Sequence, residues 1–273
     1  MLTEKTFATG NMAIQYAEGP PGGSPLLMLH GITLRWQNFL SVLTLFSLRY
    51  HTYALDLRGH GHSSRATDAY RIEHYAEDVV QFLRTQVPEP AVLMGHSLGA
   101  EISIRVAAAA PELTRAVILE EPGLYFFPEG RFPQHSLYQI LTTLYTLLSR
   151  APSKAEIIAT LQTLLPEGDE VGFLDWATSL HQLDPDTIAH LLDGRIFAQS
   201  HVDELLPKIM APVLLIQGNQ ELESILVQAD VERARSLLTH CRVIRRPDIG
   251  HNLHDVHPLA FYQTVTSFLE SLP

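Results

Sequence analysis

Residues 91 to 110 place a short apolar run, the pentapeptide Gly95-His96-Ser97-Leu98-Gly99 and an alanine-rich segment one after another. This order predicts a buried strand, a tight turn and a helix, with the serine at the turn. The glycines of a G-x-S-x-G turn let the backbone crowd around the serine, and the positive end of the following helix favours an anion beside it. The segment therefore requires a sheet with helices packed on it and makes Ser97 a candidate nucleophile.

Strand patterns alternate with helical patterns over the first 120 residues. The expected strands are Met12 to Glu18, Leu26 to His30, His51 to Asp56, Ala91 to Met94 and Ala116 to Glu120, and the expected helices are Arg35 to Leu48, Glu73 to Thr85 and Ser97 to Ala110. Such alternation is typical of right-handed crossovers between parallel strands. We therefore predict an α/β fold class with a mostly parallel, doubly wound sheet.

Only helical patterns occur in the next part of the chain: Ser136 to Ser149, Lys154 to Leu164, Val171 to Gln182 and Pro185 to Leu192. Strands return at Pro212 to Ile216 and Arg242 to Arg245, with helices at Val227 to Leu238 and Pro258 to Leu269. The simplest organisation is a core of residues 1–122 and 209–273, with a helical cap, residues 123–208, inserted after the sixth strand.

Composition narrows the possible partners. The 273 residues are 46% hydrophobic and 18% charged, as in globular proteins, and the net charge is −11. Because Lys and Arg are not clustered, we expect no nucleic-acid partner. No apolar stretch is long enough for a membrane span and no signal-peptide pattern follows Met1, so we expect a cytoplasmic protein. The single cysteine and the 14 histidines show no paired spacing, so no metal site is expected.

A serine hydroxyl needs a base to become a nucleophile, and histidine suits that role near neutral pH. In open α/β sheets the residues that bind ligands follow the carboxyl ends of the strands. His251 follows the last expected strand and precedes the last helix, so we predict it as the base. His254 and His257 are its nearest rivals, and His96, inside the turn, lies at the expected substrate site.

These features resemble the α/β-hydrolase fold superfamily over nearly the whole chain. The matching segments are His30-Gly31, Asp56 to Ser63, the Ser97 turn, Pro212 to Gly218 and Gly250-His251. The resemblance implies a sheet of about eight strands, a triad in the order nucleophile, acid, histidine, and no cofactor. It also implies an oxyanion hole made of the backbone N–H groups of Ile32 and Leu98.

The resemblance leaves the acid of the triad open. Superfamily members usually carry an aspartate three residues beyond the glycine after the seventh strand, and that position, counted from Gly218, is Glu221. A minority place the acid after the sixth strand, where this chain has Glu121. A buried carboxylate without a partner would be costly, which slightly favours Glu121. Glu120 and Glu223 are weaker candidates.

Specificity is expected to come from the cap. Its aromatic residues are Tyr125, Phe126, Phe127, Tyr138, Tyr145, Phe173 and Trp176, and Trp36 follows the oxyanion segment. Lined by Trp36, Tyr125, Phe126 and Trp176, an apolar pocket would suit an uncharged ester or lactone. The predicted function is therefore a serine hydrolase that works through an acyl-enzyme.

Two other functions compete with this one. Hydrolases of carbon-carbon bonds in ring-cleavage products share the fold, but they generally carry tryptophan after the catalytic histidine, where this chain has Asn252. A ligand receptor or interaction protein could also be built on a hydrolase scaffold. The fold is compatible with a monomer or a homodimer.

Overall fold

The sheet has eight strands and is antiparallel only at one edge. The computed structural model describes residues 2–10, 12–197 and 201–272. The strand order is β1-β2-β4-β3-β5-β6-β7-β8, with antiparallel pairing from β1 through β4 and parallel pairing elsewhere. The strands are β1 (Thr3–Thr9), β2 (Met12–Glu18), β3 (Pro25–Leu29), β4 (His51–Leu55), β5 (Ala91–His96), β6 (Thr114–Glu120), β7 (Val213–Gln217) and β8 (Cys241–Arg245). This topology confirms the predicted fold class.

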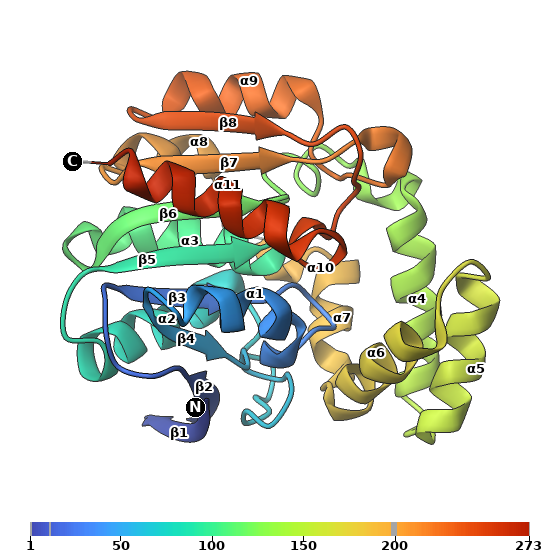
Figure 1. The fold of residues 1–273 in the computed structure, drawn as a ribbon. Coiled ribbons are helices and arrows are strands. Elements are labelled where there is room, and N and C mark those ends of the chain that lie inside the picture. The colour runs from blue at the N-terminus through green and yellow to red at the C-terminus, as the bar shows by residue number, and fades with distance from the viewer. Residues whose placement is uncertain (1, 11, 198–200, 273) are drawn as a thin grey trace.

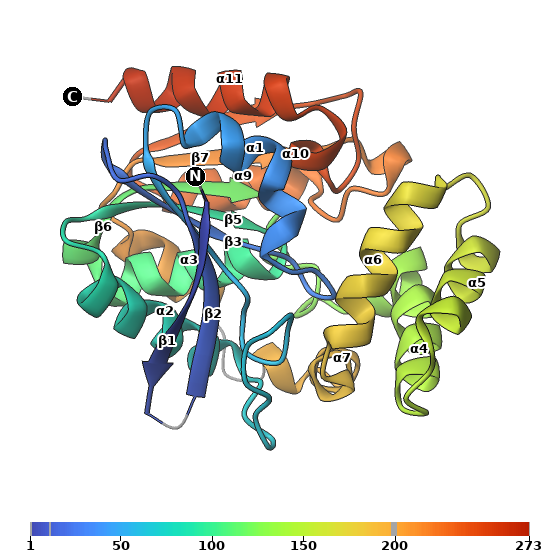
Figure 2. The ribbon, with the colours of Figure 1, turned by 60° about the horizontal axis from the view of Figure 1, so that its bottom comes forward.

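Helices cover both faces of the sheet because successive strand residues point to opposite faces. In β3, Leu27 and Leu29 belong to one buried cluster, whereas Leu26 and Met28 belong to the other. The first face carries α2 (Ile72–Gln86), α3 (Leu98–Ala109) and α9 (Gln228–Leu237). The second face carries α1 (Leu40–Phe46) and α11 (Pro258–Glu270), and the sheet lies between the two layers in Figure 2.

The helical insertion, defined here as α4 to α7, stands beyond the carboxyl ends of the parallel strands (Figure 1). Its helices are α4 (Ser136–Leu148), α5 (Lys154–Leu164), α6 (Glu170–Gln182) and α7 (Pro185–Leu192), each within one residue of the predicted ends. Ser153 and Glu156 form a capping box at the start of α5, and Asp169 caps α6. α8 (Val202–Leu205) follows before the chain returns to β7.

Two elements differ from the sequence prediction. β1 was not predicted because most of its residues are exposed and only Phe7 is buried, so it lacks the pattern of a core strand. It nevertheless pairs with β2 along its whole length. The single helix expected over Arg35 to Leu48 is instead a 3-10 turn, η1 (Trp36–Phe39), followed by the short α1.

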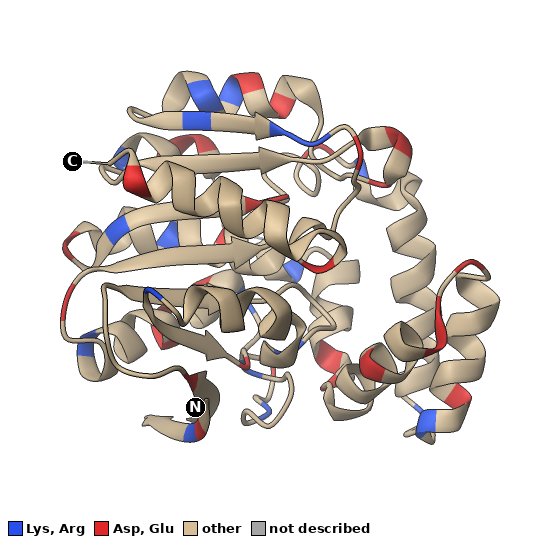
Figure 3. Cartoon of the chain, in the orientation of Figure 1, with Lys and Arg blue, Asp and Glu red and all other residues tan. Residues whose placement is uncertain are grey.

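Charge is spread unevenly over the elements. Lys and Arg are scattered over both helical layers and the strands in Figure 3, whereas α4 carries no charged residue. Within the described residues, no helix combines the length and apolar character needed to cross a membrane.

Candidate active site

Ser97 occupies the turn between β5 and α3 in a strained backbone conformation. Its φ is 51° and its ψ is −111°, a region that residues with a side chain rarely adopt. Its N–H donates to the carbonyl of Glu120 at 2.9 Å, which ties the turn to β6. A Cβ on Gly95 would overlap the carbonyl of Gly99, and one on Gly99 would overlap that of Leu29. Close packing therefore requires both glycines of the motif.

The loop after β3 packs against this turn. A Cβ on Gly31 would lie 2.9 Å from Nδ1 of His96, so the loop approaches as closely as glycine allows. Gly31 begins a hydrogen-bonded four-residue turn whose third residue, Thr33, has a φ of 68°. Within the described residues, neither the N–H of Ile32 nor that of Leu98 donates a hydrogen bond. Two backbone donors beside a turn serine are the elements of an oxyanion hole.

Glu121 lies beside His251 and is fully buried. Its carboxylate accepts hydrogen bonds from the N–H of Gly218 at 2.7 Å, the hydroxyl of Ser224 at 2.9 Å and the N–H of Ile225 at 3.0 Å. The remaining direction of Oε2 faces Nδ1 of His251 at 3.4 Å. Three donors thus hold the carboxylate in place, and the imidazole is its fourth neighbour.

The other candidate acids lie away from His251. Glu221 is exposed on η6 (Gln220–Leu222), and its carboxylate has no hydrogen-bond partner in the part of the chain that the structure describes. Glu223 is exposed as well and accepts a hydrogen bond from the hydroxyl of Ser136. The structure therefore brings Glu121 to the histidine and leaves Glu221 at the surface.

A second Glu–His pair lies next to the first. Nδ1 of His254 is 2.7 Å from Oε2 of Glu120, and the His254 N–H donates to Oε1 at 2.9 Å. The side chains are 2% and 1% exposed. Burial alone lowers the pKa of His254, but the Glu120 carboxylate outweighs burial and raises it. This rival base is thus a core residue, and His257 is exposed, 3.7 Å from Asp248.

The ring of His96 lies between the two other imidazoles. Its centroid is 4.7 Å from that of His251 and 5.0 Å from that of His254. Burial and these neighbours lower the pKa of His96 well below its usual range, so the ring is neutral. Its Nε2 lies 3.0 Å from the carbonyl oxygen of His251, which assigns the proton to Nε2. His96 therefore ties β5 to the loop that carries His251.

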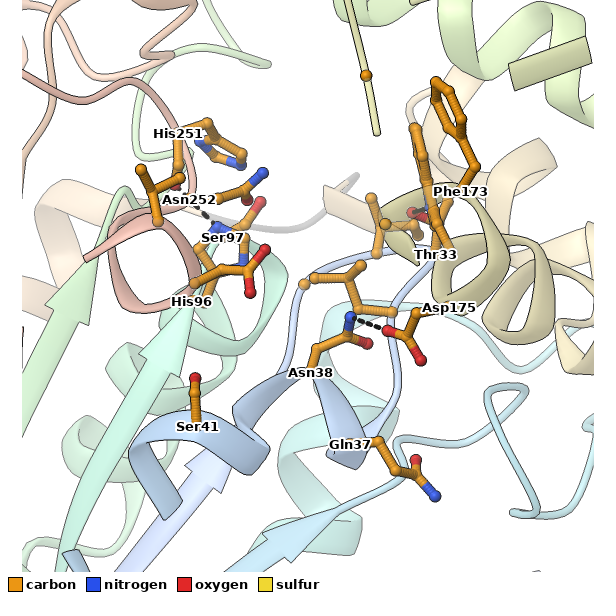
Figure 4. Close-up of a pocket in the computed structure, with 18 of the residues that line it drawn as sticks. Thr33, Gln37, Asn38, Ser41, His96, Ser97, Phe173, Asp175, His251 and Asn252 are labelled. Carbon is orange, nitrogen blue, oxygen red and sulfur yellow. Dashed lines mark hydrogen bonds between the residues drawn. The ribbon is translucent and has the colours of Figure 1, made fainter. Parts of the chain in front are cut away.

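A cavity of about 1170 Å³ separates the sheet edge from the helical insertion. His251 and Ser97 line the same end of it in Figure 4. The insertion contributes an apolar wall of Leu137, Leu141, Leu165, Val171, Phe173 and Trp176. Asp169, Asp175 and Asp255 also line it, whereas none of its described lining residues is Lys or Arg.

The predicted aromatic lining is wrong in part. Trp176 and His96 line the cavity as predicted, but Tyr125, Phe126 and Trp36 do not. The Tyr125 hydroxyl donates to Asp203 at 2.6 Å, and Phe126 packs in a cluster of aromatic rings. Both are buried because they anchor the start of the insertion to the core, so leucines form most of the wall instead.

Three residues of the site were not identified from the sequence. Ser224 holds Glu121, and Asn38 and Asp175 meet across the cavity wall. The spacing between these partners exceeds 100 residues, so no local pattern could pair them. A metal site is not evident either, since no group of three or more His, Cys, Asp or Glu in the described ranges could hold an ion.

The sheet order, the strained serine turn and the loops at the strand ends define an α/β hydrolase. Residues 24–258 match the family described as alpha/beta hydrolase fold, and the chain belongs to it.

Two similar proteins and one solved structure are more specific. The 2-(acetamidomethylene)succinate hydrolase of Mesorhizobium japonicum is 26% identical over 92% of this chain and 90% of its own length. The magnesium-chelatase 30 kDa subunit of Rhodobacter capsulatus is 30% identical over 87% of this chain and 84% of its own length. A crystal structure of E-2-(acetamidomethylene)succinate hydrolase superposes with a TM-score of 0.81 over 99% of this chain and 100% of that one, at 23% identity. At that identity the superposition establishes the fold alone.

Proposed function

We propose that this protein is a serine hydrolase that cleaves carboxylic esters or lactones through an acyl-enzyme. The observation that carries the proposal is the buried Glu121 carboxylate, held by three donors and 3.4 Å from the imidazole of His251, whose ring lines the same cavity as Ser97. A carboxylate behind a histidine that faces a serine is the arrangement of a nucleophilic triad.

In the proposed reaction, Nε2 of His251 removes the proton of the Ser97 hydroxyl as Oγ attacks the carbonyl carbon. Glu121 accepts from Nδ1–H and stabilises the imidazolium. The backbone N–H groups of Ile32 and Leu98 bind the oxyanion, each contributing about 3 kcal/mol to the transition state. His251 then protonates the leaving group, and a water activated by the same histidine releases the acyl group. No hydrogen bond joins Ser97 to His251 in the described chain, and such bonds commonly tighten only when substrate binds.

The cavity chemistry favours an uncharged substrate. Its wall is largely apolar, and its charged lining residues other than histidine are aspartates. A succinate, as in the name of the Mesorhizobium relative, would bring two carboxylates that no described Lys or Arg of the lining would neutralise. We therefore propose a neutral ester or lactone with an apolar acyl part, bound beneath the helical insertion as a cap.

The test is hydrolysis of p-nitrophenyl esters with acyl chains of two to eight carbons, followed over many turnovers. Ser97→Ala should abolish turnover because it removes the nucleophile. Ser41→Ala is the matched control, since Ser41 lines the same cavity without a neighbouring imidazole, and it should retain most of the activity. Equal rates for wild type and Ser97→Ala would overturn the proposal.

A second candidate function is ligand binding within an assembly, with little turnover. It is favoured by the similarity to a protein named as a subunit of magnesium chelatase. Fast multiple turnover of any ester in the series would exclude it.

A further inference from the structure

Helix α6 of the insertion contacts the loop after β3 through three side-chain hydrogen bonds. Nε1 of Trp176 donates to the hydroxyl of Thr33 at 3.1 Å. The adjacent Asp175 accepts from Arg35 at 2.5 Å and from Asn38 at 3.1 Å. Figure 4 shows Asp175 and Asn38 facing each other across the cavity wall, with Thr33 beside them. We refer to these three bonds as the α6 clamp.

The clamp grips the most strained residue of that loop. A φ of 68° at Thr33 is a genuine outlier for a β-branched side chain, because the third position of such a turn usually holds glycine or asparagine. A conformation of this kind persists only where surrounding contacts fix it. The Thr33 side chain is nearly buried, and the printed hydrogen bond of its hydroxyl is the one to Trp176.

The residue before Thr33 is Ile32, whose N–H is the oxyanion donor of the proposed function. A peptide N–H is oriented by the φ and ψ angles on both sides of it, so the Thr33 turn controls where this donor points. On the core side, Nδ1 of the buried His30 donates to the Gly31 carbonyl at 2.8 Å. The loop is thus held by the core at Gly31 and by the insertion at Thr33, with Ile32 between the two attachments.

The clamp also explains what Arg35 does. Its side chain is 13% exposed, and its guanidinium is paired with the Asp175 carboxylate. A positive charge so close to the cavity would otherwise be available to an anionic substrate. Because Asp175 neutralises it, the ion pair serves the attachment of α6 rather than recognition of a carboxylate.

We propose that Trp176 and Asp175 are positioning residues for the oxyanion hole, which the insertion completes through the α6 clamp. This proposal rests on the proposed serine hydrolase function. It predicts that weakening the clamp lowers kcat, because the Ile32 donor is misdirected in the transition state. A residue that only lines the cavity would raise KM instead.

The test uses Trp176→Phe, which removes the indole N–H and keeps an aromatic ring, and Thr33→Val, which removes the hydroxyl and keeps the shape. Each should lower kcat for the best p-nitrophenyl ester by about tenfold with KM within twofold, since loss of a whole oxyanion donor costs 10²- to 10³-fold. The double variant should be no slower than either single one, because both remove the same bond. Thr33→Ser should restore the rate. Thr178→Val, the same change one turn from the clamp on α6, is the matched control, because that hydroxyl donates to the Leu174 carbonyl of its own helix.

Amide hydrogen exchange of residues 31–38 provides a readout that does not depend on turnover. Exchange should accelerate in Trp176→Phe and in Asp175→Asn, and not in Thr178→Val. An unchanged kcat and unchanged exchange in Trp176→Phe would overturn the clamp while leaving the serine hydrolase intact. Loss of the proposed function would be recognised separately, because wild type itself would then fail to turn over esters in a Ser97-dependent way.

Discussion

Two neighbouring glutamates at the end of β6 each hold a histidine, and the two pairs differ in almost every other respect. Glu120 is bonded to His254 at 2.7 Å, and both side chains are buried in the core. Glu121 lies 3.4 Å from His251, whose side chain is 19% exposed and lines the cavity. The same chemical pair therefore occurs once as a closed structural contact and once with an imidazole open to ligands.

The difference follows from backbone geometry. Successive residues of a strand point to opposite faces, so Glu120 and Glu121 necessarily diverge at the strand end. Glu121 then adopts a φ of 51°, which turns the chain away from the sheet as the carboxylate enters a nest of three donors. The comparison teaches that residue type and position in the sequence do not distinguish a catalytic pair from a structural one. Access of the histidine to the cavity does.

The largest expected effect is on turnover at the open pair. Glu121→Gln should lower kcat by roughly 10³- to 10⁴-fold, because the amide no longer fixes the tautomer of His251 or stabilises its cation. Glu120→Gln should lower kcat of the folded protein by less than tenfold. Steady-state kinetics on the best p-nitrophenyl ester would decide, and a reversed order of the two variants would contradict the assignment.

Stability should show the opposite order. Removing one partner of a buried ion pair leaves the other charge unsatisfied, so Glu120→Gln should lower the free energy of unfolding by about 3–5 kcal/mol. Urea denaturation of both variants measures this. Glu121→Gln should lose less, because an amide still accepts hydrogen bonds from its three donors. Equal losses would mean that the closed pair has no special structural role.

The closed pair should also make stability depend on pH. Since the pKa of His254 is raised in the folded protein, its contribution is complete below about 6.5, the ordinary value, and is lost as pH rises through the folded value. The difference in unfolding free energy between wild type and Glu120→Gln should therefore shrink from pH 6 to pH 9. Denaturation curves at several pH values measure it, and a difference that grows with pH would contradict the sign.

The smallest effect is expected at the surface candidate. Glu221→Gln should change neither kcat by more than twofold nor stability by more than about 0.5 kcal/mol, because the carboxylate is exposed. A large loss of kcat in this variant, with Glu121→Gln active, would exchange the roles of the two glutamates.

The sequence predicted the fold well because its signals are local. Parallel strands buried on both faces read as continuous apolar runs, and the helices of the insertion begin and end at caps and prolines such as Ser153 and Pro185. β1 escaped prediction because an edge strand with one buried residue has no apolar pattern to read.

The site was predictable only where residues follow strand ends. Ser97, His251 and both glutamates could be named in this way, but not the choice between the glutamates, since it depends on Gly218, Ser224 and Ile225 meeting one carboxylate. The cavity wall was harder still. Aromatic composition predicted Tyr125 and Phe126 as lining, yet large rings serve equally well to pack helices, and packing is what they do here.

The two outermost strands carry charges where the sheet could otherwise continue. β1 exposes Glu4 and Lys5, and β8 exposes Arg242 and Arg245. An unpaired strand edge is a template for another chain, and charged side chains on it oppose such pairing. Two copies that joined edge to edge would have to bring these side chains out of water. The sheet is therefore protected at both ends against growth into larger aggregates, and any self-association of this protein is better sought on its helical faces.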